Sequence, residues 1–507
     1  MTSPSSLLLW LYFTLLASLS VYGLHRCYLV YLYTKYRRPV SAGADSEIVS
    51  GSGPAQGSWV PFVTVQLPIY NEMYVVDRLV DAVAGLDHPH DRLQIQLLDD
   101  STDETQHIAR HAVDRAAALG LDIQYLHRSH RTGFKAGALA EGLRHARGEL
   151  IAIFDADFVP PADFLSRVLK PFSDPGVGMV QARWGHINGD YSLLTRVQAM
   201  FLDAHFILEH GARNRGGLFF NFNGTAGVWR REAIESAGGW QHDTLTEDLD
   251  LSYRAQLAGW RFVFLPDVVA PAEVPVEMNG FKTQQHRWAR GSIQTGLKIL
   301  PTLLRARVPL RVKLEAMFHL TANLNHPLIL TLSVIMVPAL LTRATMGSIS
   351  VLAIDVPLFC AATLSMVNFY AVSQRALRND WLAQLRYIPA LMAVGIGLSV
   401  NNTRAVLGAR LGRQTPFRRT AKYGVARRGD EWLTKRYRQT NIAQPAVELG
   451  LGLYFTAGVI YAVSHGVWAP LPFFVLFQAG FMYIGLQSLL QQFASPDPVL
   501  RAQVAGD

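Results

Sequence analysis

At 507 residues, with 50% hydrophobic side chains and a mean hydropathy of +0.15, the chain is too apolar for a wholly soluble protein. The net charge of +8 does not indicate nucleic-acid binding, because Arg404–Asn441 alone holds eleven basic residues against two acidic ones, a net of +9. The only cysteines, Cys27 and Cys360, lie far apart in apolar segments, so neither a disulfide framework nor a thiolate metal site is expected.

The chain begins with an apolar segment that can cross a membrane. Leu7–Leu24 is long enough to span a bilayer, and the basic cluster Lys35–Arg38 follows it, while no basic residue precedes it. A signal peptide would carry a positive n-region, so we expect an anchor over residues 1–34, with the N terminus outside and the next domain inside. Residues 35–60, rich in Ser, Gly and Ala, are expected to form a linker.

Between Pro61 and about Pro275, short apolar strands alternate with helices. In the order strand, helix, strand, helix, strand, helix, strand, we expect Phe62–Leu67, Val75–Leu86, Ile95–Leu98, Thr105–Leu119, Ile123–Leu126, Phe134–Ala146 and Leu150–Phe154. This alternation predicts an α/β sheet with largely parallel strands. In such sheets, ligands bind beyond the carboxyl ends of the strands.

Acidic residues stand where two of these strands end. Asp99 and Asp100 close one strand, and Asp155 and Asp157 follow another. One or two carboxylates beside substrate phosphates commonly hold a divalent cation, which neutralises a leaving diphosphate. A lone Asp-x-Asp is also common as a helix cap and turn. Together with the other motifs, however, Asp155 and Asp157 are expected to bind a metal ion.

Two later motifs complete a set that predicts sugar transfer. Asp248, beside Glu247, opens an apparent helix, and a carboxylate that takes the proton of an acceptor hydroxyl contributes about 10²- to 10⁴-fold to the rate. The alternative for this motif is a helix-capping segment. In Gln284-x-x-Arg287-Trp288, Arg can bind a diphosphate and Trp offers a flat face to a pyranose ring. Arg-Trp alone would equally fit an amphipathic helix on a membrane.

The C-terminal part contains five further apolar runs. They are Pro327–Leu341, Val351–Val372, Ile388–Leu407, Ala446–Val463 and Pro470–Leu490. If all five crossed, the basic segment after Leu407 would face outside, against the positive-inside rule. Ile388–Leu407 is interrupted by Pro, Gly and Asn residues, so we expect it to be an interfacial or partly inserted helix. This leaves one span before the globular domain, four after it, and a cytosolic basic loop.

Taken together, these motifs resemble the family 2 inverting glycosyltransferases, and within them the processive β-polysaccharide synthases of the cellulose synthase superfamily. The resemblance covers about Val63 to Lys422 and keeps the order of the family's motifs. It implies a GT-A-like, Rossmann-like cytosolic domain with a helical transmembrane bundle, and Mg²⁺ or Mn²⁺ as cofactor. The run Phe219–Arg230 and the Gln-Gln-His-Arg-Trp stretch resemble plant cellulose-synthase-like mannan and glucan synthases more than bacterial cellulose synthases.

Four further segments resemble family motifs. Pro68–Glu72 is similar to a nucleotide-binding P-x-Y-N-E, which implies that Tyr70 stacks on the base, and Phe134–Gly137 contains a K-A-G with a donor-site lysine. Phe222–Thr225 stands in the place of an acceptor-lining F-C-G-S, from which its second and fourth residues depart. Phe417–Lys422 is similar to the F-x-V-T-x-K gating loop that covers the nucleotide, with Arg in place of the valine.

The resemblance implies a role for each candidate site residue. The catalytic residues are Asp248, as the base, and Glu247, and the metal ligands are Asp155 and Asp157. The expected donor-binding residues are Tyr70, Glu72, Asp99, Asp100, Lys135, Asp155, Gln284, Arg287, Thr420 and Lys422. The expected acceptor-binding residues are Phe222, Asn223, Gly224, Thr225 and Trp288. The gating-loop residues are Phe417, Thr420 and Lys422.

The expected domain boundaries follow from the spans and motifs. In chain order they are an anchor (1–34), a linker (35–60), a GT-A glycosyltransferase domain (61–300), an interfacial helix (301–326), two transmembrane helices (327–372), a second interfacial helix (384–408), a cytosolic gating loop (409–445), two transmembrane helices (446–491) and a short cytosolic tail (492–507).

We therefore expect a processive membrane enzyme that extends a β-linked glucan or mannan from UDP-glucose or GDP-mannose, with inversion, and exports it. The expected partners are the nucleotide sugar, the growing β-glycan, the bilayer and a cell-envelope export partner, without nucleic acid. The expected location is a bacterial inner membrane, with the catalytic domain in the cytoplasm. Two alternatives remain: a non-processive enzyme that glycosylates a lipid, and a non-catalytic polysaccharide channel.

Overall fold

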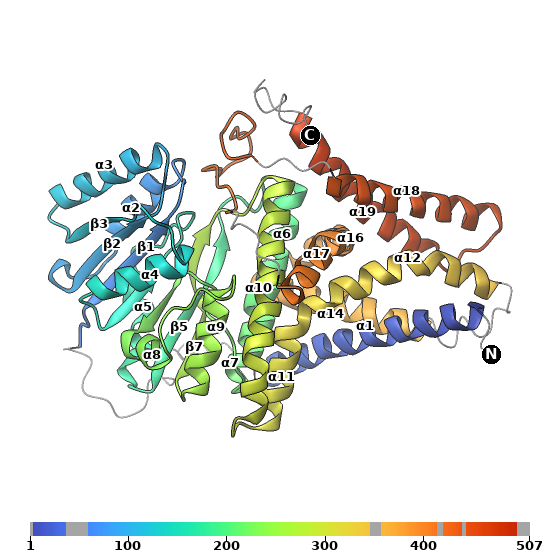
Figure 1. Cartoon of the computed structure of the whole chain (residues 1–507), viewed down its shortest axis with the longest axis horizontal. Coiled ribbons are helices and arrows are strands. Elements are labelled where there is room, and N and C mark those ends of the chain that lie inside the picture. The colour runs from blue at the N-terminus through green and yellow to red at the C-terminus, as the bar shows by residue number, and fades with distance from the viewer. Residues whose placement is uncertain (1–3, 37–58, 345–355, 413–418, 439–442, 494–507) are drawn as a thin grey trace.

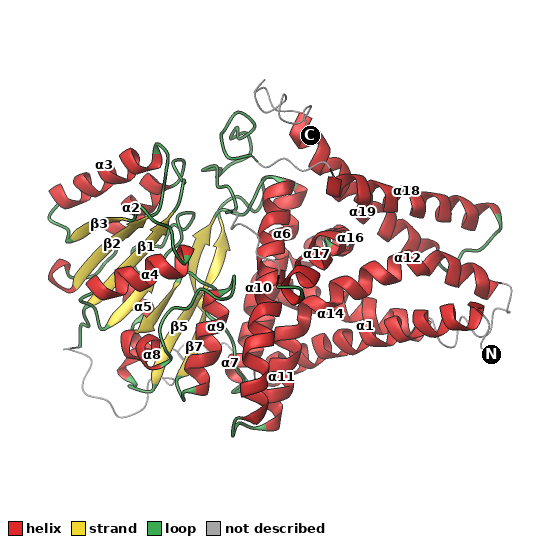
Figure 2. Ribbon diagram, viewed as in Figure 1, coloured by secondary structure: helices red, strands yellow, loops and turns green. Residues whose placement is uncertain are grey.

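The computed structural model describes residues 4–36, 59–344, 356–412, 419–438 and 443–493. An α/β domain forms one end of the molecule, and long helices extend from it to the other end, where the N terminus lies (Figure 1). Colouring by secondary structure shows the same division, because all strands belong to the α/β part (Figure 2). The expected combination of a globular domain with a helical membrane part is confirmed.

The domain is built on a seven-stranded sheet in the order β3-β2-β1-β4-β6-β5-β7. The strands are β1 Val63–Ile69, β2 Leu93–Asp99, β3 Ile123–His127, β4 Leu150–Ile153, β5 Val177–His186, β6 Gly227–Arg230 and β7 Arg261–Ala272. β1 to β4 are parallel to one another, and β5 pairs in parallel with β7, whereas β6 runs antiparallel to both β4 and β5. The sheet is therefore mixed, and its parallel strands β1 to β4 come from the N-terminal half of the domain.

Helices cover this sheet on both faces. They are α2 Val76–Ala84, α3 Thr105–Ala118, α4 Phe134–His145, α5 Phe164–Val168, α6 Leu193–Ala204, α7 Gly211–Arg215, α8 Arg231–Ser236 and α9 Glu247–Leu257. The seven elements predicted up to residue 154 all form, each within two residues of its expected ends.

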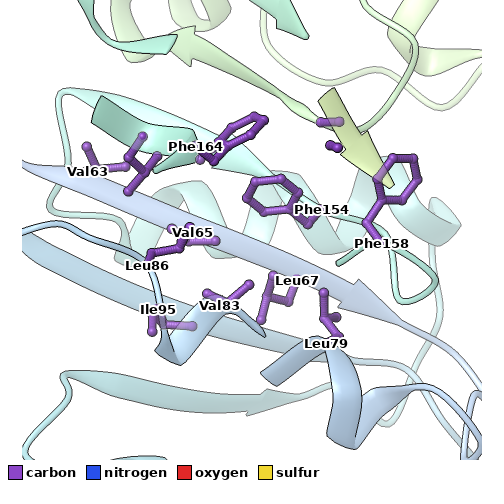
Figure 3. Packing of buried hydrophobic residues seen from close by; sticks show 14 of the residues in the cluster. Val63, Val65, Leu67, Leu79, Val83, Leu86, Ile95, Phe154, Phe158 and Phe164 are labelled. Carbon is purple, nitrogen blue, oxygen red and sulfur yellow. The ribbon is translucent and has the colours of Figure 1, made fainter. Parts of the chain in front are cut away.

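Apolar and polar residues alternate along much of the central strands, and the apolar side chains form the core. Val63, Val65 and Leu67 of β1 face a cluster that includes Phe154 and Phe164 (Figure 3). Every residue of β1 and β2 is buried, because both faces of the sheet are covered. Polar side chains on the opposite face pair across the strands: Gln66 Nε2 donates to Gln96 Oε1 over 3.0 Å. The rigid sheet thereby fixes the strand ends that carry the acidic motifs.

The helical part consists of one N-terminal helix and a series that follows the sheet. These are α1 Pro4–Lys35, α10 Met278–Arg305, α11 Leu310–Thr321, α12 Asn325–Ala344, α14 Val356–Leu377, α15 Trp381–Gln384, α16 Ile388–Gly397, α17 Ser399–Arg410, α18 Ala443–Ser464 and α19 Leu471–Phe493. α10 stands between the sheet domain and the other helices (Figure 1). It runs through residue 300, where the sequence predicted a domain boundary. α1 packs against both α12 and α14, and α18 packs against α19.

Four helical stretches of the described chain are long and apolar enough to cross a membrane. They are Ser6–Lys35, Leu310–Thr342, Ala443–Ser464 and Leu471–Phe493. The pair Trp381–Gly397 and Ser399–Arg410 reaches the same standard only when taken together, and it bends by 41° at its junction. This bend coincides with the run that was predicted to be interfacial or partly inserted. α14, at the predicted span 351–372, is not among the four.

Candidate active site

A cavity lies where the carboxyl ends of β1 and β4 approach the start of α9, the middle of α10 and the segment 419–422. Most of the predicted site residues line it together: Tyr70, Glu72, Asp100, Lys135, Asp155, Asp157, Asn223, Gly224, Glu247, Asp248, Gln284, Arg287, Trp288, Thr420 and Lys422. Motifs separated by more than 300 residues thus converge on one site.

Three predicted residues lie behind the cavity wall instead of lining it. Asp99 is fully buried, accepts from the Tyr125 hydroxyl over 2.6 Å and from the Ser101 amide over 2.7 Å, and so shapes the end of β2. Phe222 belongs to the hydrophobic core. Thr225 Oγ1 accepts from the Asp155 amide over 2.9 Å and supports the acidic loop. Their contacts with a ligand stay predictions, and Phe417 lies outside the described residues.

Asp155 is held by a lysine from α4. Lys135 Nζ lies 2.5 Å from Asp155 Oδ1 and donates to the carbonyl of Gly224 over 2.8 Å. Burial works against the charged ammonium, but the carboxylates of Asp155 and Glu247 outweigh it and raise the pKa of Lys135. This ammonium therefore stays charged and joins the acidic loop to the segment that carries Asn223.

Asp157 is held by the segment that corresponds to the predicted gating loop. Lys422 Nζ lies 2.6 Å from Asp157 Oδ2 and donates to the carbonyl of Glu273 over 2.5 Å. The Tyr423 amide donates to Glu273 Oε1 over 2.8 Å, and the Tyr423 hydroxyl donates to Glu277 Oε2 over 2.9 Å. Residues 420–423 are buried, so this segment is docked over the cavity.

Asp248 is buried next to a second carboxylate, that of Glu247. Its Oδ1 accepts from the amide of Leu249 over 2.8 Å, which fixes the carboxylate at the start of α9. Burial, and after it the neighbouring Glu247 carboxylate, raises the pKa of Asp248 to about 7, against the opposing field of Lys135. Burial also raises the pKa of Glu247. Two residues on, Asp250 pairs with Arg254 at 2.8 Å and with Lys298 at 3.0 Å and has a structural role.

Glu72 is the second carboxyl group of the cavity whose titration lies near neutrality. Burial is the main cause, and it raises the pKa of Glu72 to about 7 although Arg419 opposes it. Arg419 NH1 lies 3.7 Å from Glu72 Oε1. The guanidinium also lies over the Tyr437 ring, 4.0 Å from its centre. The residue that replaces the expected valine therefore contacts the donor side of the cavity.

The α10 motif presents one face to the cavity. Gln284, Arg287 and Trp288 follow the i, i+3, i+4 spacing of a helix face, and all three line the cavity. His286 points elsewhere, and its Nδ1 lies 3.3 Å from the carbonyl of Asn401 in α17. It had been expected to be a packing or hydrogen-bonding residue, and this contact agrees.

The sequence motifs did not predict two arginines that contact residues of the cavity. Arg128 forms a bidentate pair with Asp100, at 2.7 Å from Nε to Oδ1 and 2.5 Å from NH2 to Oδ2. The Arg131 guanidinium lies over the ring of Tyr70, 3.4 Å from its centre, and so covers the face on which a nucleobase was expected to stack. The only signal in the sequence was the basic run just before the K-A-G segment.

Comparisons with known proteins agree with this geometry. Residues 61–291 match the family model described as "Glycosyltransferase like family 2". The chain carries a glycosyltransferase family 2 domain. It is 45% identical over 251 residues to glucomannan 4-beta-mannosyltransferase 1 of Oryza sativa subsp. japonica, covering 48% of each chain. It is 39% identical over 317 residues to glucomannan 4-beta-mannosyltransferase 1 of Cyamopsis tetragonoloba, covering 61% of this chain and 60% of that one.

The chain spans about half the length of the first of these relatives. Among solved structures, the mannosyltransferase PcManGT from Pyrobaculum calidifontis, in complex with GDP-Man and Mn²⁺, superposes with a TM-score of 0.54 at 22% identity. The match covers 80% of this chain and 100% of that one. At this identity the likeness concerns the fold, and it confirms the GT-A-like fold class of the glycosyltransferase domain.

The carboxylate oxygens of Asp155 and Asp157 fit a divalent cation that also binds the phosphates of a substrate. Within the described ranges, no group of three His, Cys, Asp or Glu side chains could form a complete metal cage. Asp155 and Asp157 nevertheless both line the cavity, where Lys135 contacts Oδ1 of Asp155 and Lys422 contacts Oδ2 of Asp157. Mg²⁺ in nucleotide sites commonly uses one or two carboxylates together with substrate phosphates. These two residues fit such a cation.

Proposed function

We propose that the chain is a processive membrane β-glycosyltransferase that transfers mannose from GDP-mannose onto a growing β-1,4-linked glycan. The observation that carries this proposal is one cavity in which Asp248, a carboxyl group with a pKa of about 7, lies with the side chains of Asp155, Asp157, Lys135, Arg287 and Trp288. The mannosyl donor is supported by the names of the curated relatives and of the fold neighbour solved with GDP-Man and Mn²⁺.

In the proposed reaction, Asp248 takes the proton of the acceptor hydroxyl as that oxygen attacks the anomeric carbon. A pKa near 7 suits this step, because the carboxylate is sufficiently ionised at neutral pH and still basic enough to hold the proton. Inversion follows from a single displacement, in which the nucleoside diphosphate leaves from the opposite face of the sugar.

The leaving diphosphate needs positive charge on its own side of the cavity. A divalent cation held by Asp155 and Asp157 would supply Lewis acidity to the diphosphate. Lys135, Arg287 and Lys422 of the chain itself lie around the same space and can contact anionic oxygens. Trp288 offers its ring to the acceptor sugar, at the end of the α10 motif.

Processivity and export are part of the same proposal. Two features support them: α10, which bears the motif, contacts α17 of the helical bundle, and the bundle contains stretches able to cross a membrane. A polymer that leaves the acceptor side would enter this bundle. We place the glycosyltransferase domain on the cytosolic side. The relatives reported above come from plants and give no support to a bacterial inner membrane.

The test is a donor assay with the full chain, purified in detergent. Labelled GDP-mannose and UDP-glucose are supplied separately with Mg²⁺ or Mn²⁺, and incorporation into polymer is measured. The expected result is incorporation from GDP-mannose that stops with EDTA and returns when the cation is restored. Transfer of single sugars to lipid would support the lipid-glycosylating alternative, and turnover of neither donor would contradict the proposed activity.

A further inference from the structure

A hydrogen-bonded chain joins the acceptor side of the cavity to the first helix of the protein. It consists of Asn223, His205, Glu209 and Arg26, whose contacts with one another the sequence motifs did not predict. Asn223 lines the cavity in the segment between α7 and β6. His205 and Glu209 belong to the π-helical turn η4 His205–His210, which follows α6. π-helical turns occur frequently at functional sites because they displace side chains from their α-helical positions.

The carboxylate of Glu209 fixes the tautomer of His205. Glu209 Oε1 lies 2.5 Å from Arg26 NH1, and its Oε2 lies 3.6 Å from Arg213 NH1. Burial works against the charged carboxylate, but Arg26 and the hydrogen bond from His205 outweigh it and hold the pKa of Glu209 well below its usual range. Oε2 therefore accepts a hydrogen bond from His205 Nδ1–H over 2.8 Å.

The tautomer of His205 in turn orients the Asn223 amide. With Nδ1–H donating to Glu209, Nε2 can accept a hydrogen bond, and the NH₂ group of an amide can only donate one. Asn223 Nδ2 lies 2.8 Å from this atom and donates to it. The backbone amide of Asn223 is anchored separately, by donating to Gln181 Oε1 over 2.9 Å. The amide group of Asn223 is thereby held in one of its two orientations.

The other end of that amide lacks a partner. Asn223 Oδ1 is buried, and no hydrogen-bond donor of the described chain reaches it. A buried carbonyl oxygen without a donor costs roughly 1–3 kcal/mol. A glycan hydroxyl in the cavity can supply the missing donor.

We propose that His205 is a positioning residue that holds the Asn223 amide so that Oδ1 receives a hydrogen bond from a hydroxyl group of the acceptor glycan. This inference rests on the proposed function, because it assigns the acceptor side of that same site. If His205 instead donated from Nε2, the amide would turn and present its NH₂ group to the acceptor. The contacts of His205 with Glu209 and Asn223 thus select a hydroxyl that donates at this position.

The hydrogen-bonded series that starts at Asn223 ends at α1, which contains one of the stretches able to cross a membrane. Arg26 belongs to α1, and its guanidinium lies over the ring of Phe369 in α14, 4.6 Å from the ring centre. The orientation of an acceptor-side residue therefore depends on how α1 and α14 pack against η4, which both helices contact. The acceptor site is complete only when the N-terminal helix is in place.

The test separates acceptor use from donor use. The variants are His205→Phe, Asn223→Ala and the double variant, and the readouts are nucleoside diphosphate released and sugar incorporated. Each single variant is expected to lower sugar incorporated per diphosphate released by about tenfold, because water can replace the acceptor without help from Asn223. Donor affinity should stay within about twofold. In the Asn223→Ala background, His205→Phe should add nothing, because it acts through Asn223.

Two further variants guard against a merely structural effect. His205→Gln keeps an oxygen that can accept from Asn223 Nδ2, so it should restore much of the ratio. His210→Gln is the matched control: His210 is buried in the same turn and bonds the carbonyl of Asn221 over 2.9 Å, but it does not line the cavity, so the ratio should be unchanged. Additive losses in the double variant, or equal losses of both readouts, would overturn the inference. A parent protein that incorporates no sugar would instead contradict the proposed function.

Discussion

Opposing effects of its surroundings set the pKa of Asp248, and its proposed role as the base depends on their balance. Burial and the Glu247 carboxylate favour its protonated form, whereas the Lys135 ammonium favours the carboxylate. A base in this environment binds a proton more strongly than an exposed aspartate would, and it releases that proton near neutral pH.

Replacing Asp248 by Asn tests this role. The amide keeps the size of the side chain and can still contact the amide of Leu249, but it cannot accept a proton from the acceptor. Sugar transfer should fall by at least about 10²-fold, while donor binding changes little. Asp250→Asn is the matched control, because Asp250 is occupied by Arg254 and Lys298 away from the reaction. Turnover of Asp248→Asn close to that of the parent would rule out Asp248 as the base.

The titration of Asp248 also predicts a pH profile. Because the carboxylate must be ionised to take a proton and its pKa is about 7, kcat/KM for the donor should rise as pH increases through about 7 and then level off. A free aspartate would place the same rise near pH 4. Rates measured from pH 5.5 to 8.5 at saturating cation check this, and a flat profile over that range would contradict the raised pKa.

At the scale of elements, α10 and segment 419–423 both line the cavity, and substitutions in them should impair different steps of the reaction. Trp288→Ala removes a flat apolar surface without removing charge, so nucleotide affinity should hold while elongation collapses. Lys422→Ala removes the ammonium beside Asp157 and loosens the docked segment, so the KM for the donor should rise about tenfold.

Arg427→Ala is the matched control for Lys422→Ala, because Arg427 is an exposed cation of the same basic segment. Nucleotide affinity and product length, measured side by side, distinguish the two roles. Loss of nucleotide binding in Trp288→Ala together with product of normal length would show that Trp288 is not on the acceptor side.

The site residues that could be predicted are those that lie next to elements recognisable in the sequence. Contacts between residues far apart in the sequence could not be predicted. The elements of the parallel half follow from apolar runs bounded by turns, and Asp100, Asp155 and Asp248 stand next to such elements. Arg131 over Tyr70 and Arg128 on Asp100 could not be predicted, because those contacts depend on how the segment after β3 crosses the strand ends. The chain from Asn223 to Arg26 joins residues nearly 200 positions apart, and its residues form no motif.

At the scale of the whole molecule, the bent pair α16–α17 decides the topology. If residues 388–410 do not cross, the exposed residues Asn379 and Arg427, which flank the pair, lie on the same side of the membrane. Single cysteines at these two positions, in a background with Cys27→Ser and Cys360→Ser, should therefore react with an impermeant maleimide from the same side of sealed vesicles. Labelling from opposite sides would mean that the pair crosses, and the cytosolic position of the basic loop would then be wrong.

The central claim is that one cavity performs repeated β-transfer of mannose from a nucleotide sugar. The most direct measurement is the length and linkage of the product that the purified full chain makes from labelled GDP-mannose, determined by size separation before and after digestion with an endo-β-1,4-mannanase, with Asp248→Asn as the inactive control. We expect long chains from the earliest time points, and we expect the mannanase to degrade them completely. Only singly glycosylated products, or a polymer that the mannanase leaves intact, would contradict it.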